Sequence, residues 1–392
     1  MGNSTLRCLS IFTKLTSLRR KAPLLYGVIG IWLLFEFVGL LILPEVIPRT
    51  QYLSWYLGTQ SVDATHRFLQ GDAYLLPDKY CGWRNRPNVA IGNWVIDANG
   101  ARSVHPNHVG LVKERRLIFL GSSMVNGGTH VKNNETISGY FEGGDVEALN
   151  FGTMMYSMDQ CLLSYRHDLH KYQAKVVVVG LDLSSIGGLN NHYIPLRMRE
   201  ERNMPYLKPR YELTDGKLRL IPVHPEIQLA RVPNNPELFD FLRKNDHYYD
   251  YFSGYCRMGL FPLSAFIRFA YHRVHKLCNY FIPDSETEDL LLAVMDNIVQ
   301  TAREHGACVI FIMMPSEKEY SRRGIQSILP DLYSRALHII RSGEFNVIDA
   351  RQVLLLSRQP TAELFHEDGV HYKPLANRLI AQALRDKILP IH

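Results

Sequence analysis

The fold class is decided by residues 117–123, which read Leu117-Ile118-Phe119-Leu120-Gly121-Ser122-Ser123. Four apolar residues without polar alternation are typical of a parallel strand that is covered on both faces. The glycine and the two serines that follow are typical of a turn into a helix. The stretch therefore predicts a buried strand that ends in a turn carrying two hydroxyl groups.

Further runs of the same character predict the rest of a sheet. The expected strands are Leu117–Leu120, Val146–Asn150, Val176–Leu181, Cys308–Met314 and Val347–Asp349. Helical patterns are expected around 135–142, 158–171, 286–305, 325–342 and Pro374–Ile388. Strands that alternate with helices predict an α/β fold with a doubly wound, mainly parallel sheet. Sites in such sheets form beyond the C-terminal ends of the strands, which is where Ser123 is expected.

The net charge of +6 is concentrated at the N-terminus. Residues 1–21 hold five basic residues and no acidic one, so the rest of the chain is close to neutral. A near-neutral domain offers no electrostatic surface for nucleic acid, and we expect no nucleic-acid partner.

An almost unbroken apolar run follows the basic tail, over residues 22–43, interrupted by Glu36 and ended by Pro44. About 20 apolar residues cross a bilayer as a helix, and basic residues before such a helix favour a cytoplasmic N-terminus. The run predicts a lipid bilayer contact and a single-pass protein of the cell inner membrane, with its main domain periplasmic or extracellular. A cleaved signal peptide and a buried soluble helix are the alternatives.

The predicted organisation has four parts: a basic tail at 1–21, a transmembrane helix at 22–43, a connector with a hairpin cap at 44–113, and an α/β domain at 114–388. Within the cap, Trp94–Arg102 is expected to form a hairpin around Asn99-Gly100. The regular alternation breaks at about 187–284, which predicts an insertion with an Asp-Gly hairpin over Tyr211–Leu220. That insertion either shapes a substrate cleft or packs as a subdomain.

The six cysteines show no spacing typical of metal ligands, so no metal site is expected. Cys256 and Cys278 are candidates for a disulfide in an oxidising compartment, although spacing alone does not pair them.

Ser123 and His371 are the candidate catalytic residues. Ser123 follows the first predicted strand, and its N–H would lie at a helix start, which suits an oxyanion. His371 ends the motif Asp368-Gly369-Val370-His371, where Asp368 can hold the imidazole in one tautomer. Nucleophile, base and orienting carboxylate are what acyl transfer requires. Each motif by itself also fits a structural alternative, an N-cap serine or a loop histidine.

Together with Asn150-Phe151-Gly152, these motifs resemble the GDSL/SGNH hydrolase superfamily over about 114–186 and 286–388. The resemblance implies an SGNH or flavodoxin-like α/β fold. It also implies that Ser123 is the nucleophile, His371 the base, Asp368 its orienting partner and the Gly152 N–H an oxyanion donor. The N-terminal anchor, hairpin and insertion resemble membrane-bound bacterial members that act on cell-envelope glycans.

The sequence departs from the family pattern at two places. Ser122 stands where the family usually has an aspartate before the nucleophile. The third block, where a Gly-x-Asn-Asp sequence normally supplies an oxyanion-hole asparagine, reads Gly180-Leu181-Asp182-Leu183-Ser184-Ser185. If Gly180 is aligned, the Asp182 carboxylate would repel the oxyanion, whereas a shifted alignment places the hydroxyl of Ser184 or Ser185 there as a donor. Losing one such donor costs about 3–4 kcal/mol.

The sequence therefore predicts an extracytoplasmic serine esterase or O-acyltransferase that forms an acyl-enzyme and requires no metal or cofactor. The expected substrate is an acylated cell-envelope glycan or a small ester. The alternative is a catalytically silent SGNH-fold protein that binds glycan or acts as a scaffold.

Overall fold

The computed structural model describes residues 26–27, 29–38, 74–104, 115–143, 145–198, 206–223, 236–249, 285–322, 327 and 330–388. The chain divides into two compact units. The first consists of Met1–Trp55 and Tyr251–Leu277, and the second of Tyr56–Asp250 and Cys278–His392. The second unit contains the sheet and the candidate site.

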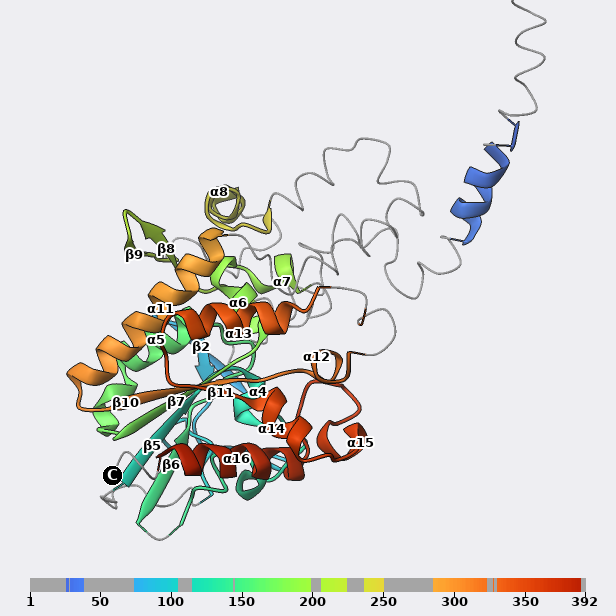
Figure 1. The fold of residues 1–392 in the computed structure, drawn as a ribbon. Helices are drawn as coiled ribbons and strands as arrows, with labels where there is room; N and C mark the ends of the chain where they lie inside the picture. The colour runs from blue at the N-terminus through green and yellow to red at the C-terminus, as the bar shows by residue number, and fades with distance from the viewer. Residues whose placement is uncertain are drawn as a thin grey trace, which may run out of the picture. The chain divides into compact units, whose positions relative to one another are not determined.

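The second unit is built on a five-stranded parallel sheet with the strand order β11-β10-β7-β5-β6 (Figure 1). Its strands are β5 (Arg115–Leu120), β6 (Val146–Asn150), β7 (Val176–Leu181), β10 (Cys308–Met313) and β11 (Val347–Asp349). The predicted strands are confirmed to within two residues. Because the strands are parallel, their C-terminal ends meet at one edge of the sheet, and the segments that follow them are brought together there.

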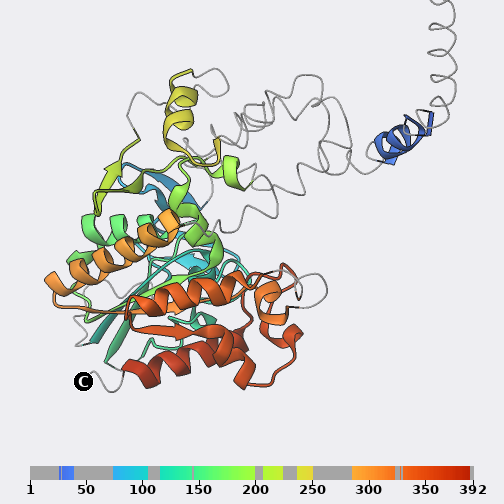
Figure 2. The same cartoon turned by 45° about the horizontal axis from the view of Figure 1, so that its top comes forward.

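Helices cover both faces of this sheet (Figures 1 and 2). One face carries α5 (Met158–His167), α11 (Ser285–Glu304) and α13 (Leu332–Ser342); the other carries α14 (Ala350–Leu356) and α16 (Pro374–Ile388). Along β7, Val177 and Val179 belong to the first core, whereas Val176 and Val178 belong to the second. Both faces of the strand are therefore buried, which is why its sequence shows no polar alternation. This layering confirms the doubly wound α/β prediction.

Shorter elements complete the unit. They are the helices α4 (Ser123–Asn126), α6 (Leu183–Gly187), α7 (Ile194–Arg197), α8 (Pro236–Asn245), α12 (Glu317–Ser321) and α15 (Thr361–Leu364), with the 3-10 turns η1 (Asn133–Glu135), η2 (Leu169–Tyr172) and η3 (Gly188–Asn190).

The helix predicted at 135–142 is wrong, because η1 and a series of turns occupy this segment. Thr136 Oγ1 donates to Asn133 O at 2.8 Å and accepts from the Gly139 N–H at 3.0 Å. Side-chain hydrogen bonds of this kind compete with helix formation.

The segment before the sheet contains two antiparallel pairs, β1 (Leu75–Asp78) with β2 (Gly82–Asn85) and β3 (Val89–Ile91) with β4 (Trp94–Ile96). The hairpin expected within Trp94–Arg102 is therefore wrong, since β4 pairs with the strand that precedes it. The Asn99-Gly100 turn does form, because Asp97 Oδ1 accepts the N–H groups of Asn99 and Ala101. It leads Arg102 to a bridge with Asn150 on β6.

The predicted hairpin of the insertion is confirmed as β8 (Arg210–Thr214) and β9 (Lys217–Ile221). Asp215 and Gly216 have φ values of 50° and 72°, as an Asp-Gly hairpin turn requires. Both strands contact α11, and β8 also contacts α5 and η3. The described parts of the insertion therefore pack on one helical face of the sheet. The four-part division at 1–21, 22–43, 44–113 and 114–388 stays a prediction, and the Cys256–Cys278 pair lies outside the described residues.

The predicted membrane location is contradicted. No helix among the described residues is both long enough and apolar enough to cross a membrane. Of the apolar run over residues 22–43, the structure describes 26–27 and 29–38 as helical. The rest of 22–43 lies outside the described residues. The finding of no such helix among the described residues contradicts the predicted single-pass location in the inner membrane, with a cytoplasmic N-terminus and a periplasmic or extracellular main domain.

Candidate active site

Glycines at the sheet edge allow the turn that carries Ser123. Gly121 directly follows β5 with a φ of 147°, and a Cβ there would lie 2.6 Å from Gly180 O. A Cβ on Gly180 would lie 2.2 Å from a methyl carbon of Val125. Helix α4 therefore packs directly on the edge of the sheet. Its first residue, Ser123, lies at the C-terminal end of β5, as the sequence predicts.

The two adjacent serines have different environments. Ser122 is buried; its Oγ donates to Asp182 Oδ2 at 2.7 Å and accepts from the Met124 N–H. Ser123 is partly exposed, and within the described residues neither its hydroxyl nor its N–H has a hydrogen-bond partner. Of the two hydroxyl groups, only that of Ser123 is available to a substrate.

The Asp-x-x-His motif forms a tight turn that holds the histidine ring. Asp368 Oδ1 accepts the N–H groups of Val370 at 2.8 Å and His371 at 2.9 Å, while Oδ2 lies 2.6 Å from His371 Nδ1. Although burial acts to raise it, these hydrogen bonds lower the pKa of Asp368 to about 2. An ionised carboxylate at Nδ1 requires a proton there, which leaves Nε2 of the neutral ring as an acceptor.

The acceptor nitrogen of His371 has no partner of its own. His371 Nε2 is buried and makes no hydrogen bond within the described residues. A Cβ on Gly128 would lie 3.3 Å from this nitrogen, so the ring lies over the turn that follows α4. Figure 1 shows α4, α12 and α15 at the same end of the sheet. The fold thus brings the Asp-x-x-His turn to the helix that begins with Ser123.

A second histidine, which the sequence analysis did not single out, lies beside this pair. His130 Nε2 is 3.1 Å from Asp368 Oδ2, and its ring stacks on that of His366 with a centroid distance of 4.7 Å. His130 belongs to no recognisable motif. It reaches Asp368 only because the turn at Gly127 and Gly128 directs the chain back toward the His371 loop.

Arg102 fixes the turn between α4 and His130, and it too was missed. Its guanidinium group is buried and donates to Asn126 O at 2.8 Å, to the carbonyl oxygens of Gly128 and Val131, and to Asn133 Oδ1 at 2.8 Å. Burial lowers the pKa of Arg102 to about 10, so the group remains charged at neutral pH. A single arginine after a turn gives no sequence signal for this role.

Gly152, the expected oxyanion donor, is close to α4, but its N–H is already engaged. A Cβ there would lie 2.6 Å from the Asn126 N atom. The Gly152 N–H donates to Asn150 Oδ1 at 2.9 Å, and its carbonyl accepts from Asn126 Nδ2 at 2.7 Å. Gly152 therefore lies where the family resemblance places it, with its N–H directed to a side chain of its own loop.

The third block is reorganised around Asp182. Asp182 Oδ1 caps α6 by accepting the Ser185 N–H at 2.9 Å, while Oδ2 accepts from Ser122. Ser185 Oγ donates to Asp182 O at 2.8 Å, so its hydroxyl proton is used locally. Ser184 is partly exposed, with its Oγ 3.1 Å from a guanidinium nitrogen of Arg197. Burial raises the pKa of Asp182.

No family model matches the sequence, and no curated protein matches it either. Among solved structures the chain is similar to TesA, with 12% identity and a TM-score of 0.35, over 71% of this chain and 100% of that chain. It is similar to Axe2, an acetylxylan esterase from Geobacillus stearothermophilus, with 12% identity, a TM-score of 0.36, and 70% and 94% coverage. LAE5, an alpha/beta hydrolase from the metagenome of Lake Arreo, gives 10% identity, a TM-score of 0.36, and 69% and 93% coverage.

Likeness at these scores does not determine chemistry, which depends on the site itself. The Gly-x-Ser motif follows β5, the Asn-x-Gly motif begins at the last residue of β6, and the Asp-x-x-His motif precedes α16. The His371 ring of the last motif lies against Gly128, in the turn that follows the Ser123 helix. The chain therefore has the α/β fold class and the motif order of the GDSL/SGNH hydrolase superfamily, the family that its sequence resembles.

Proposed function

We propose that this protein is a serine esterase that cleaves an acyl ester through an acyl-enzyme on Ser123. One observation carries the proposal. Asp368 holds His371 Nδ1 at 2.6 Å and leaves Nε2 buried over the turn that follows the Ser123 helix, with no hydrogen-bond partner among the described residues. An unprotonated ring nitrogen can accept a hydrogen bond. The hydroxyl of an attacking serine is the donor that this nitrogen requires.

In this mechanism Ser123 is the nucleophile, His371 transfers the protons and Asp368 orients the histidine. Ser123 Oγ attacks the ester carbonyl carbon, and its proton passes to His371 Nε2. Asp368 remains ionised, as its lowered pKa requires, and stabilises the imidazolium through Nδ1–H. The imidazolium then protonates the leaving alkoxide. Water then attacks the acyl-Ser123 ester while His371 Nε2 accepts its proton. The bond between the acyl carbon and Ser123 Oγ breaks, and the imidazolium returns the proton to Ser123 Oγ as the acid leaves.

The oxyanion is assigned first to the backbone N–H of Ser123. This N–H lies at the start of α4 and has no acceptor within the described residues. The Gly152 N–H serves as a second donor if it exchanges Asn150 Oδ1 for the oxyanion. The Ser184 hydroxyl, beside Arg197, is the third candidate. Both carboxylate oxygens of Asp182 are engaged in hydrogen bonds, one with Ser122 Oγ and the other with the Ser185 N–H.

The proposal extends to an acylated glycan or a small ester as the substrate class, on the basis of the family resemblance. Hydrolysis and O-acyl transfer share the acyl-enzyme and differ only in whether water or a sugar hydroxyl releases it. Supplying an acylated donor together with a sugar acceptor, and counting free acid against acylated sugar, separates the two outcomes.

The test is covalent labelling of the purified protein with a fluorophosphonate. The wild type should acquire one label, which mass spectrometry should place on Ser123. Ser123→Ala and His371→Ala should not label at a comparable rate. Ser122→Ala is the matched control and should still label, because its hydroxyl is bonded to Asp182.

The alternative of a catalytically silent protein that binds glycan or acts as a scaffold gives the opposite result. A wild type that melts cooperatively and shows no label, while a known serine esterase labels under the same conditions, contradicts the esterase proposal.

A further inference from the structure

The geometry points to a divalent metal site on His130, Asp368 and His371 that switches the proposed base off. One donor atom from each side chain, two ring nitrogens and a carboxylate oxygen, lies within 4.8 Å of the other two. Asp368 Oδ2 is the shared centre, 3.1 Å from His130 Nε2 and 2.6 Å from His371 Nδ1. Two imidazoles and one carboxylate are a donor set that Zn²⁺ favours, with a fourth position left for water.

The three side chains are open to an ion from solvent. The exposed fractions are 39% for His130, 33% for Asp368 and 18% for His371. Zn²⁺ requires ligands at about 2.0–2.2 Å, so each donor needs only a small adjustment to share one ion. His130 is held in place for this role, because its ring stacks on His366 and its turn is fixed by Arg102.

A bound ion would affect catalysis by changing which ring nitrogen of His371 carries the proton. A neutral imidazole carries one N–H, which Asp368 keeps on Nδ1 and which leaves the Nε2 lone pair for the Ser123 proton. An ion bound at Nδ1 is coordinated by a lone pair on Nδ1, so the single ring proton must move from Nδ1 to Nε2. No proton is gained or lost, but Nε2 becomes a donor and no longer accepts from Ser123. The bound ion also occupies the carboxylate that would stabilise the imidazolium.

A metal ion bound at this site would inhibit the enzyme, and this effect on catalysis rests on the proposed esterase function. Metal binding itself is independent of that function, because Ser123 is not a ligand. Binding and labelling are therefore measured separately, so that a failure of one is distinguished from a failure of the other.

Binding is measured by calorimetric titration of the whole purified protein with Zn²⁺. Wild type and Ser123→Ala should bind one ion with the same affinity. His130→Ala should bind at least about tenfold more weakly, a loss of about 1.4 kcal/mol or more. His338→Ala is the matched control, because this histidine is exposed on α13, outside the three-residue site, and its removal should leave that affinity unchanged.

Inhibition is measured as the ratio of fluorophosphonate labelling rates with and without saturating Zn²⁺, taken within each variant. The ratio should be well below one for the wild type and for His338→Ala, and close to one for His130→Ala. Loss of zinc affinity in His130→Ala supports the site even if no variant labels. Equal zinc affinity of wild type and His130→Ala, or faster labelling of the wild type with zinc, overturns the inference.

Discussion

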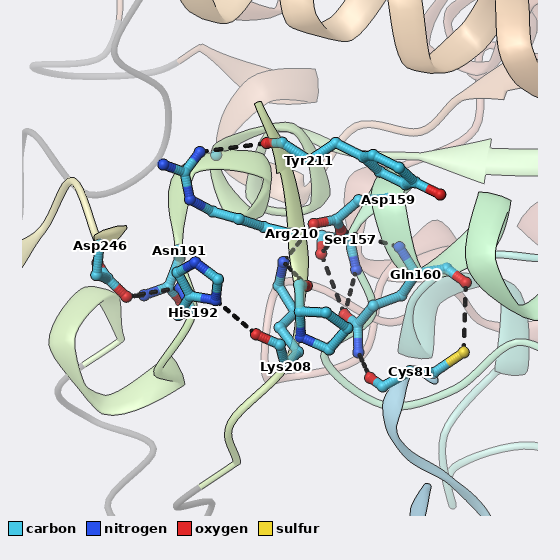
Figure 3. Close-up of polar contacts among 12 residues, drawn as sticks. Cys81, Ser157, Asp159, Gln160, Asn191, His192, Lys208, Arg210, Tyr211 and Asp246 are labelled. Carbon is cyan, nitrogen blue, oxygen red and sulfur yellow. Dashed lines mark hydrogen bonds and ion pairs between the residues drawn. The ribbon is translucent and has the colours of Figure 1, made fainter. Parts of the chain in front are cut away.

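Lys208→Met should destabilise the protein strongly, because it breaks an ion pair that has no access to water. Lys208 Nζ lies 2.5 Å from Asp159 Oδ2, and both side chains are 0% exposed (Figure 3). Asp159 Oδ1 also accepts from Ser157 Oγ and from the Gln160 N–H. Within the described residues, Asp159 Oδ2 accepts only from Lys208.

The expected loss of stability follows from two opposing energies in this pair, the attraction between the two charges and the cost of removing them from water. At 2.5 Å and an effective dielectric constant of about 20, the attraction is on the order of 6 kcal/mol. Desolvation costs several kcal/mol for each ion, so the intact pair contributes little net free energy to stability. Removing the lysine cancels the attraction and leaves the carboxylate buried. We expect a loss of about 3–5 kcal/mol in the free energy of unfolding.

The assay is urea denaturation at pH 7, with a surface pair as the control. Lys171 Nζ lies 2.6 Å from Asp168 Oδ1, with side chains 55% and 48% exposed, so Lys171→Met should cost less than about 1 kcal/mol. Adding Asp159→Asn to Lys208→Met removes the stranded charge and should recover part of the loss. Equal losses for Lys208→Met and Lys171→Met, with no recovery in the double variant, would refute the reasoning.

Three further predictions concern the site and its surroundings. Asp368→Asn keeps an oxygen for the turn but favours the wrong tautomer of His371, so the fluorophosphonate labelling rate should fall on the order of 10⁴-fold; a loss below tenfold contradicts this. Gly128→Ala places a Cβ 3.2 Å from the His371 ring and should slow labelling. The control Gly92→Ala, at almost the same φ but in open space, should not slow it. Equal labelling rates for the two variants count against the position of the His371 ring over Gly128. Burial raises the pKa of Glu319 from 4.5 to about 7, so the folded protein binds more protons than the unfolded chain in this range and its stability falls as pH rises through it. Melting temperatures at pH 5 and pH 8 should differ less for Glu319→Gln than for the wild type, and an unchanged difference shows that another group is responsible.

Local sequence patterns predicted the structure correctly wherever the relevant contacts lie within one element or one turn. The five strands are rich in buried apolar residues, so their sequences indicate burial without any knowledge of their neighbours. The Asp215-Gly216 hairpin and the Asp368–His371 hydrogen bond join residues that are close along the chain. The hairpin expected at Trp94–Arg102 is wrong because β4 pairs with β3 before it, while Arg102 forms a bridge with Asn150 on the distant strand β6.

The sequence by itself therefore determined the α/β sheet, its C-terminal edge as the place for a site, and the Asp368–His371 pair. Only the tertiary structure decided which of two adjacent serines is free, since the partner that engages Ser122 is Asp182, 60 residues away. It also decided that His130 reaches Asp368 and that Arg102 holds the intervening turn. These contacts join segments that meet only when the sheet assembles, and no periodicity or spacing along the chain records them.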